Sequence, residues 1–221
     1  HLHQDASFID EEDKENIGIT FWIPLVDVNL QNGCIGLIKN SHNIYDSVCP
    51  LPFPDVYTPL WKHSFSLMPY STFIEMKAGE VLIFNSKVFH GGLPNFSDST
   101  RYALSIWLTN KTNNNYLYFL KPGTTDKLLK YKVDNDFYYK YDNNRLHEMF
   151  LKGQTLQDYK VECETDYIYK DYTKKQIIQE VVKFDNRFDN SIYEILSKYF
   201  YNEINPNIFS KVYNKLKQKL R

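Results

Sequence analysis

The residues of this sequence best suited to metal chemistry are two histidines and an aspartate. His3 and Asp5 are two positions apart, and in an extended strand such residues point to the same side of the backbone. His90 follows the apolar residues 81–84 and 88–89, where a strand could bring it to the same place. Two histidines and one carboxylate form the facial ligand set of non-haem Fe(II) oxygenases, although such a site can also take Mn(II), Ni(II) or Zn(II).

Three protein ligands on a six-coordinate ion leave three positions free, two for a 2-oxo acid and one for dioxygen. Arg101 follows His90 by eleven residues. Its planar guanidinium suits bidentate binding of a carboxylate. We therefore interpret Arg101 as a clamp for the far carboxylate of a 2-oxo diacid.

Several motifs occur in a recognisable order between residues 1 and 110. They are HQD at 3–5, FWIPL at 21–25, NGC at 32–34 with Ser41-His42 after it, AGEVLIF at 78–84 and HGG at 90–92. In these motifs the sequence resembles the phytanoyl-CoA dioxygenase family of Fe(II)/2-oxoglutarate-dependent oxygenases. The resemblance implies an iron-binding protein with 2-oxoglutarate as co-substrate and dioxygen as oxidant.

The same resemblance assigns roles to individual residues. His3, Asp5 and His90 would bind iron and, together with Arg101, form the catalytic set; Arg101, Trp22, Gln4 and Ser105 are the candidate cofactor-binding residues. One position departs from the family pattern. Where relatives often have a hydroxyl residue two positions after the distal histidine, this chain has Gly92, and Ser105 is our candidate to supply that contact.

The implied reaction is hydroxylation of an unactivated C–H bond of a small molecule, with 2-oxoglutarate converted to succinate and CO₂. The substrate could be free or linked to a carrier or a nucleotide. Asp5 favours hydroxylation over halogenation, because halogenating relatives have a small residue at that position; desaturation, cyclisation and epimerisation stay open. The alternative is an inactive oxygenase-like scaffold whose C-terminal half is a binding module.

Composition narrows the class of protein. The 221 residues include 26 basic and 27 acidic ones, which argues against a nucleic-acid-binding protein, and we find no apolar run that could span a membrane. Three widely spaced cysteines favour a reducing, cytoplasmic setting. Because the sequence starts at His1, only two residues before the first proposed ligand, we expect an N-terminally truncated fragment. Nothing in the sequence indicates an oligomeric state.

Residues 1–112 are predicted to be mainly β, a double-stranded β-helix (jelly-roll, cupin-like) oxygenase core. We expect a strand over 17–28, a hairpin turn at Asn32-Gly33 with a return strand over 34–38, and further strands over 73–76, 79–85 and 101–108. The proline-rich segment 43–70 cannot form a long regular element, so we interpret it as an ordered excursion over the pocket mouth.

Residues 113–221 differ in composition, since most of the 18 tyrosines lie there. We predict a Tyr-rich, mainly helical region. Thr173 with Gln176 is a capping box for one helix, Ser191 with Glu194 would open a second, and Asn205-Pro206 would open a third.

Overall fold

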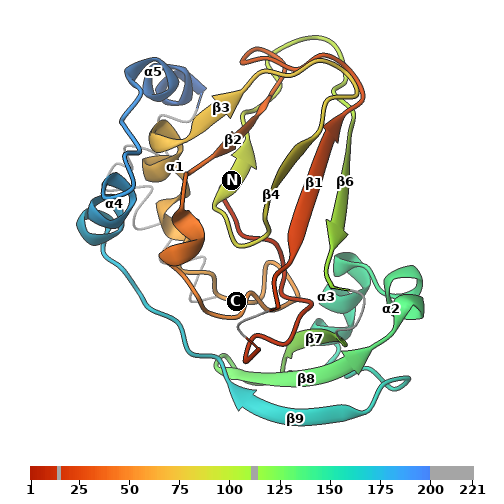
Figure 1. Ribbon diagram of the computed structural model, residues 1–221. Helices are drawn as coiled ribbons and strands as arrows, with labels where there is room; N and C mark the ends of the chain where they lie inside the picture. The colour runs from red at the N-terminus through yellow and green to blue at the C-terminus, as the bar shows by residue number, and fades with distance from the viewer. Residues whose placement is uncertain (14–15, 111–113, 200–221) are drawn as a thin grey trace.

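Two small antiparallel sheets occupy the first half of the chain in the computed structural model, which describes residues 1–13, 16–110 and 114–199 (Figure 1). One sheet has the order β4 (Leu82–Asn85), β1 (Ile19–Pro24), β6 (Ala103–Leu108); the other has the order β3 (Thr72–Ile74), β2 (Ile35–Leu37), β5 (His90–Gly92). The strand predictions are thus correct in place, although most of the strands are shorter than expected.

The chain crosses repeatedly between the two sheets. β1 pairs with β4 and β6, whereas β2 pairs with β3 and β5. The predicted hairpin between 17–28 and 34–38 is therefore wrong. Gly33 does form a tight turn with φ +89°, where an added Cβ would lie 2.6 Å from the Leu93 carbonyl oxygen, but this turn directs the chain into the opposite sheet.

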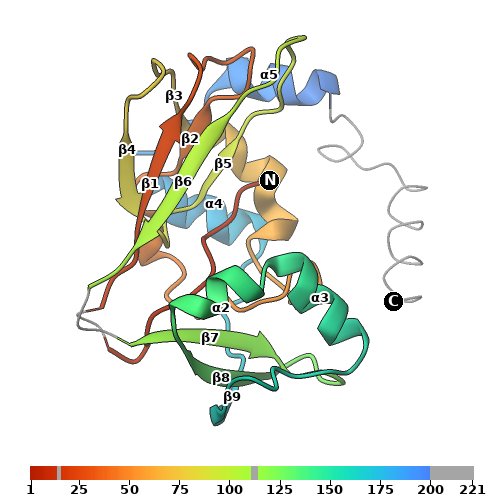
Figure 2. The same cartoon turned by 90° about the vertical axis from the view of Figure 1, so that its right-hand side faces the viewer.

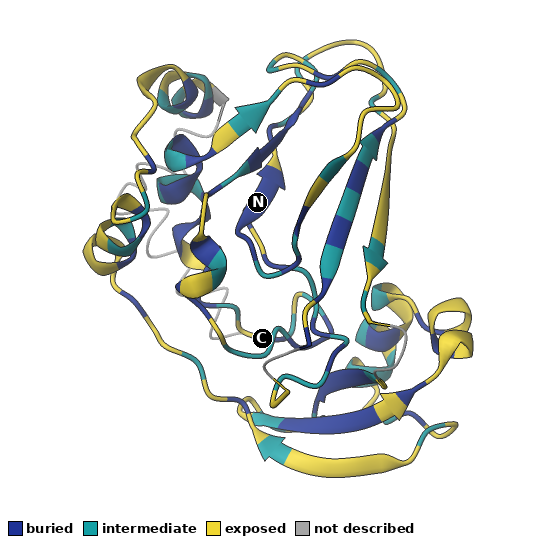
Figure 3. Ribbon diagram, viewed as in Figure 1, coloured by how far each residue is buried: buried dark blue, intermediate teal, exposed yellow. Residues whose placement is uncertain are grey.

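The sheet β4-β1-β6 has one buried and one exposed face. Thr20 and Trp22 of β1 point inward and are buried, while Ile106 of β6 and Ile83 of β4 lie on the outer face and are 39% and 56% exposed (Figure 3). Side chains on the inner face of this sheet can therefore reach toward β5, which carries His90.

The proline-rich segment 43–70 is ordered, as predicted, and is built from short helical turns. They are η2 (Trp61–His63), α1 (Ser64–Leu67) and η3 (Met68–Tyr70), preceded by η1 (Ser41–Asn43). Leu51 forms an isolated bridge with Phe119. The segment thereby links the first half of the chain to the second.

The second half contains a sheet that the sequence analysis did not predict. β7 (Asn115–Leu120), β8 (Lys127–Val133) and β9 (Val161–Asp166) form an antiparallel sheet in that order. Figure 2 shows α2 (Asn135–Lys140) and α3 (Asn143–Leu151) against one side of it. As a whole, the described chain mixes strands and helices in place of the mainly β fold with a mostly helical C-terminal segment that we expected.

Two further helices follow, and one of the two predicted starts is confirmed. Thr173 forms the capping box with Gln176 at the start of α4 (Lys174–Val182). α5 (Asn190–Tyr199) is capped by Asp189, whose carboxylate accepts hydrogen bonds from the backbone N–H of Ser191 and Ile192; Ser191 lies inside the helix. The predicted helix from Asn205-Pro206 lies outside the described residues. Among the residues that are described, no helix has the length and apolar character needed to cross a bilayer.

Both halves of the chain contribute to the same hydrophobic clusters. Leu2 and Phe89 pack in one cluster with Ile177 and Val181 of α4 and with residues of α5. A second cluster combines Leu51 and the partly buried Ala6 and Phe8 with β7, β8, α2 and α3. The division at residue 112 stays a prediction, but each half supplies part of the apolar surroundings of the other.

Phe119 is central to the second cluster and is fully buried. We expect Phe119→Ala to lower the free energy of unfolding by about 3–5 kcal/mol, because a large aromatic side chain leaves a cavity in a close-packed core. Denaturant unfolding followed by circular dichroism measures this. Tyr139→Ala is the matched control, since Tyr139 is 91% exposed, and its loss should change the stability by less than about 0.5 kcal/mol.

Candidate metal centre

The three predicted metal ligands come together in the structure. The donor atoms of His3, Asp5 and His90 all lie within 4.8 Å of one another. His3 and His90 are held by an antiparallel bridge, in which the N–H of each residue donates to the carbonyl of the other at 2.9 and 3.0 Å. Their ring centroids are 4.2 Å apart. A backbone pairing between residues far apart in sequence thus brings the two imidazoles together.

His90 presents a lone pair to Asp5. Its Nδ1 lies 2.9 Å from the carbonyl oxygen of Val88, and because a carbonyl only accepts, Nδ1 carries the proton. The Nε2 of neutral His90 is then an acceptor, 3.5 Å from Oδ1 of Asp5. Two acceptors at this distance repel each other unless a proton or a metal cation lies between them. The donor set therefore fits a cation.

Asp5 is oriented by Thr20, whose hydroxyl donates to Oδ2 at 2.5 Å. Burial alone would raise the pKa of Asp5, but the attraction of the His90 ring in its charged form and the hydrogen bond from Thr20 outweigh burial and lower the pKa below its usual value. Asp5 is therefore ionised at neutral pH. Thr20 was not singled out in the sequence, although the alternation of β1 places it on the same face as Trp22 and could have indicated it.

His3 also has one nitrogen engaged, since its Nδ1 lies 3.2 Å from the carbonyl oxygen of His1. Although His3 keeps an exposed edge, desolvation of the ring and, after it, the neighbouring His90 lower the pKa of His3 to about 4. His3 is thus neutral at physiological pH, the form in which an imidazole binds a metal.

Arg101 and Trp22 lie together, as the sequence analysis expected of two residues in one co-substrate pocket. The guanidinium carbon of Arg101 is 5.6 Å from the centroid of the Trp22 ring. Nη2 of Arg101 is 3.9 Å from where a Cβ of Gly92 would be. None of the ion pairs within the described residues involves Arg101. Its charge can therefore bind a carboxylate beside β5.

The two remaining candidate cofactor-binding residues, Gln4 and Ser105, differ in their surroundings. Gln4 is buried, and its amide donates to the carbonyls of Tyr45 and Lys87 at 3.2 and 2.8 Å. These bonds fasten the segment that carries His3 and Asp5 to Tyr45 and Lys87, and the cofactor role of Gln4 stays a prediction. Ser105 pairs with Trp22 in the register of β6 and β1, so it lies on the same face as Trp22 and its cofactor role stays a prediction.

The first part of the chain also matches a known protein family. The family described as phytanoyl-CoA dioxygenase (PhyH) matches residues 1–103. This part of the chain resembles the phytanoyl-CoA dioxygenase family in sequence. This segment contains His3, Asp5, His90 and Trp22, while Arg101 lies at its end. The family resemblance expected from the motifs is confirmed.

A curated relative of the phytanoyl-CoA dioxygenase segment is "Dioxygenase olcK" from Penicillium canescens. It is 29% identical over 110 residues, which are 48% of this chain and 32% of that protein. The chain thus spans about a third of the length of the dioxygenase that it matches.

Solved structures also resemble the chain over about half its length. The alpha ketoglutarate dependent epimerase SnoN and carbocyclase SnoK from nogalamycin biosynthesis are 18% and 20% identical, with TM-scores of 0.36 and 0.37 over 53% of this chain and 40% and 44% of theirs. EvdO2 from Micromonospora carbonacea var. aurantiaca, complexed with 2-oxoglutarate, is 17% identical, with a TM-score of 0.35 over 49% of this chain and 44% of its own. At such TM-scores these likenesses do not establish the fold.

Proposed function

We propose that this chain contains the active site of an Fe(II)/2-oxoglutarate-dependent dioxygenase that hydroxylates an unactivated C–H bond of a small molecule. The observation that carries the proposal is the convergence of three acceptor groups, those of His3, Asp5 and His90. The match of residues 1–103 to the phytanoyl-CoA dioxygenase family supports it. We also propose that β1 to β6 are the strands of a double-stranded β-helix, because the chain passes repeatedly between two sheets, one formed by β1, β4 and β6 and the other by β2, β3 and β5.

Each site residue has a defined task in this proposal. His3, Asp5 and His90 hold Fe(II), which supplies, when bound with 2-oxoglutarate and dioxygen, the oxidising chemistry of the reaction. Thr20 keeps Asp5 oriented toward the metal. Arg101 binds the far carboxylate of 2-oxoglutarate beside Trp22 and fixes its register. The proposed setting remains the cytoplasm.

An assay of purified protein tests the function. With Fe(II), dioxygen and 2-oxoglutarate, succinate should form in the same amount as CO₂, and omission of iron should stop it. Mn(II), Ni(II) and Zn(II) serve as alternative metals. If 2-oxoglutarate neither turns over nor raises the melting temperature in the presence of Fe(II), the inactive-scaffold alternative is favoured.

Thr20 provides a test of the metal centre that leaves all three ligands in place. We expect Thr20→Val to weaken Fe(II) binding about 10- to 100-fold, since Asp5 loses the hydroxyl that orients it. Anaerobic Fe(II) titration measures the affinity. Thr109→Val is the matched control, because the Thr109 hydroxyl donates to Asn16 at 3.0 Å and does not contact the ligands. Equal affinities in the two variants would contradict the assigned role.

A further inference from the structure

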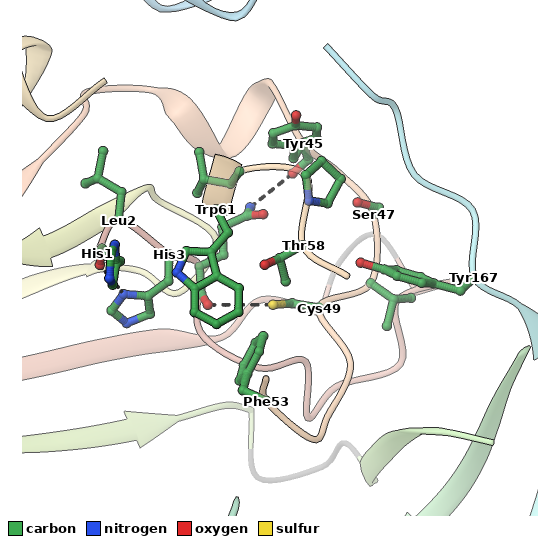
Figure 4. A pocket seen from close by; sticks show the side chains of 14 residues that line it. His1, Leu2, His3, Tyr45, Ser47, Cys49, Phe53, Thr58, Trp61 and Tyr167 are labelled. Atoms are coloured by element: carbon green, nitrogen blue, oxygen red, sulfur yellow. Dashed lines mark hydrogen bonds between the residues drawn. The ribbon is translucent and has the colours of Figure 1, made fainter. Parts of the chain in front are cut away.

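A cavity of about 350 Å³ lies directly beside the proposed metal ligand His3 (Figure 4). Three separate parts of the chain form its walls. They are residues 1–4, the segment 43–70, and Tyr167 from the second half. The cavity therefore depends on a residue that lies outside the part of the chain matched by the family.

The walls of this cavity are apolar and aromatic. Phe53, Trp61 and Tyr167 contribute rings to it, and none of its lining residues is an aspartate, glutamate, lysine or arginine. The Tyr167 hydroxyl is engaged with the carbonyl of Tyr57 at 2.8 Å. A phosphate or carboxylate placed here would be desolvated without a lysine or arginine side chain to pair with it, which is strongly unfavourable.

Two hydroxyl groups in the walls are available to a ligand. The side chains of Ser47 and Thr58 line the cavity and form no hydrogen bond with other side chains or backbone groups of the described chain. In Figure 4 both lie between the aromatic side chains. The cavity thus combines a large apolar surface with at most a few neutral polar contacts, the usual character of a small-molecule site.

The cavity and the proposed co-substrate pocket are separate. His3 is the one metal ligand that lines the cavity, and neither Arg101 nor Trp22 is part of its wall. Arg101 lies instead beside Gly92 of β5. A molecule in the cavity would therefore approach the metal past His3, while 2-oxoglutarate would be held from the Arg101 side.

From this arrangement we propose that the cavity binds the substrate, and that the bound part of the substrate is an uncharged, mainly apolar molecule with at least one ring. This proposal rests on the proposed function. It selects among the substrates that the sequence analysis left open, because the phosphates of a nucleotide or of a phosphate-bearing carrier would have to lie outside the cavity. Segment 43–70 and Tyr167 then determine specificity.

Binding of an uncharged aromatic probe tests the proposal. N-phenyl-1-naphthylamine should bind the metal-free full chain saturably, with a rise in fluorescence, and the anionic probe 8-anilinonaphthalene-1-sulfonate should bind at least about tenfold more weakly. Trp61→Ala should weaken binding of the uncharged probe at least about fivefold. Trp61 is 41% exposed, so its replacement should leave the fold intact. Tyr139→Ala, remote from the cavity, should have no effect.

Thr58→Asp is a second variant, which places a carboxylate inside the cavity and should abolish binding of the uncharged probe. Its circular dichroism spectrum and melting temperature, compared with those of the unaltered chain, test whether the variant is folded. Unchanged probe affinity in Trp61→Ala, or equal affinities for the neutral and anionic probes, would overturn the proposal.

His90→Gln separates this proposal from the proposed function. The variant should lose iron and still bind N-phenyl-1-naphthylamine, because His90 does not line the cavity. Probe binding without any 2-oxoglutarate turnover by the unaltered chain would leave the apolar site in place and refute the enzymatic function. Turnover of 2-oxoglutarate without probe binding would refute the proposed substrate cavity and leave the enzymatic function in place.

Discussion

His90→Gln is expected to abolish iron binding and succinate formation. His90 is 6% exposed, and its Nε2 faces the Asp5 carboxylate at 3.5 Å. A glutamine amide is a weaker metal ligand than an imidazole. Loss of one of the three ligands should lower the Fe(II) affinity by more than loss of a residue that only orients a ligand. We therefore expect Fe(II) affinity to fall by more than about 100-fold. Iron content after anaerobic loading and the rate of succinate formation measure the effect.

His147→Ala is the control for this variant. His147 is the other histidine with a carboxylate partner, since its Nδ1 contacts Asp55, but neither residue belongs to the metal centre. The control variant should retain its iron and its activity. Iron content that remains unchanged in His90→Gln would show that the ligand assignment is incorrect, whatever happens to the rate.

The convergence of His3, Asp5 and His90 was largely predictable because its signals are local or motif-based. The spacing of His3 and Asp5 places both side chains on one face of an extended segment. What the sequence could not indicate is the bridge between His3 and His90, because backbone pairing across 87 positions has no local signature. Thr20 was missed for a similar reason, since its hydrogen bond to Asp5 depends on where β1 lies relative to Asp5.

The errors in fold prediction have physical causes. An Asn-Gly turn is compatible with a hairpin and also with a crossover, and the pairing partners of β2, which lie far along the chain, decide between them. In β7, the tyrosines Tyr116 and Tyr118 face one hydrophobic cluster while Leu117 and Phe119 face another. Because both faces are buried, the strand lacks the alternation of polar and apolar residues that marks a half-exposed strand.

The second half of the chain also packs against the residues next to two of the proposed metal ligands. Leu2 and Phe89 directly precede the two histidine ligands, and both are buried in the cluster that contains Ile177 of α4 and Leu196 of α5. These helices therefore fix the backbone from which His3 and His90 project. The part of the chain after the matched residues 1–103 thus shapes both the geometry of the proposed ligands and, through Tyr167, the proposed substrate cavity.

Arg101→Leu is expected to raise the KM for 2-oxoglutarate about 100-fold without changing iron affinity. The guanidinium lies by Trp22 and Gly92, where it can bind the far carboxylate with two charge-assisted hydrogen bonds. Loss of such bonds costs about 3 kcal/mol, which corresponds to about a 100-fold change. Arg101→Lys keeps the charge but loses the bidentate geometry, so its KM should lie between those of the unaltered chain and the leucine variant.

Arg145→Leu is the matched control for Arg101→Leu, because Arg145 also lies over an aromatic ring, that of Tyr141 at 4.7 Å, but far along the chain from the metal ligands. Its KM should equal that of the unaltered chain. A rise in the KM for 2-oxoglutarate with unchanged iron binding is specific to a clamp, since general loss of structure would reduce iron affinity as well. Equal KM values for Arg101→Leu and Arg145→Leu would mean that another cation binds the co-substrate.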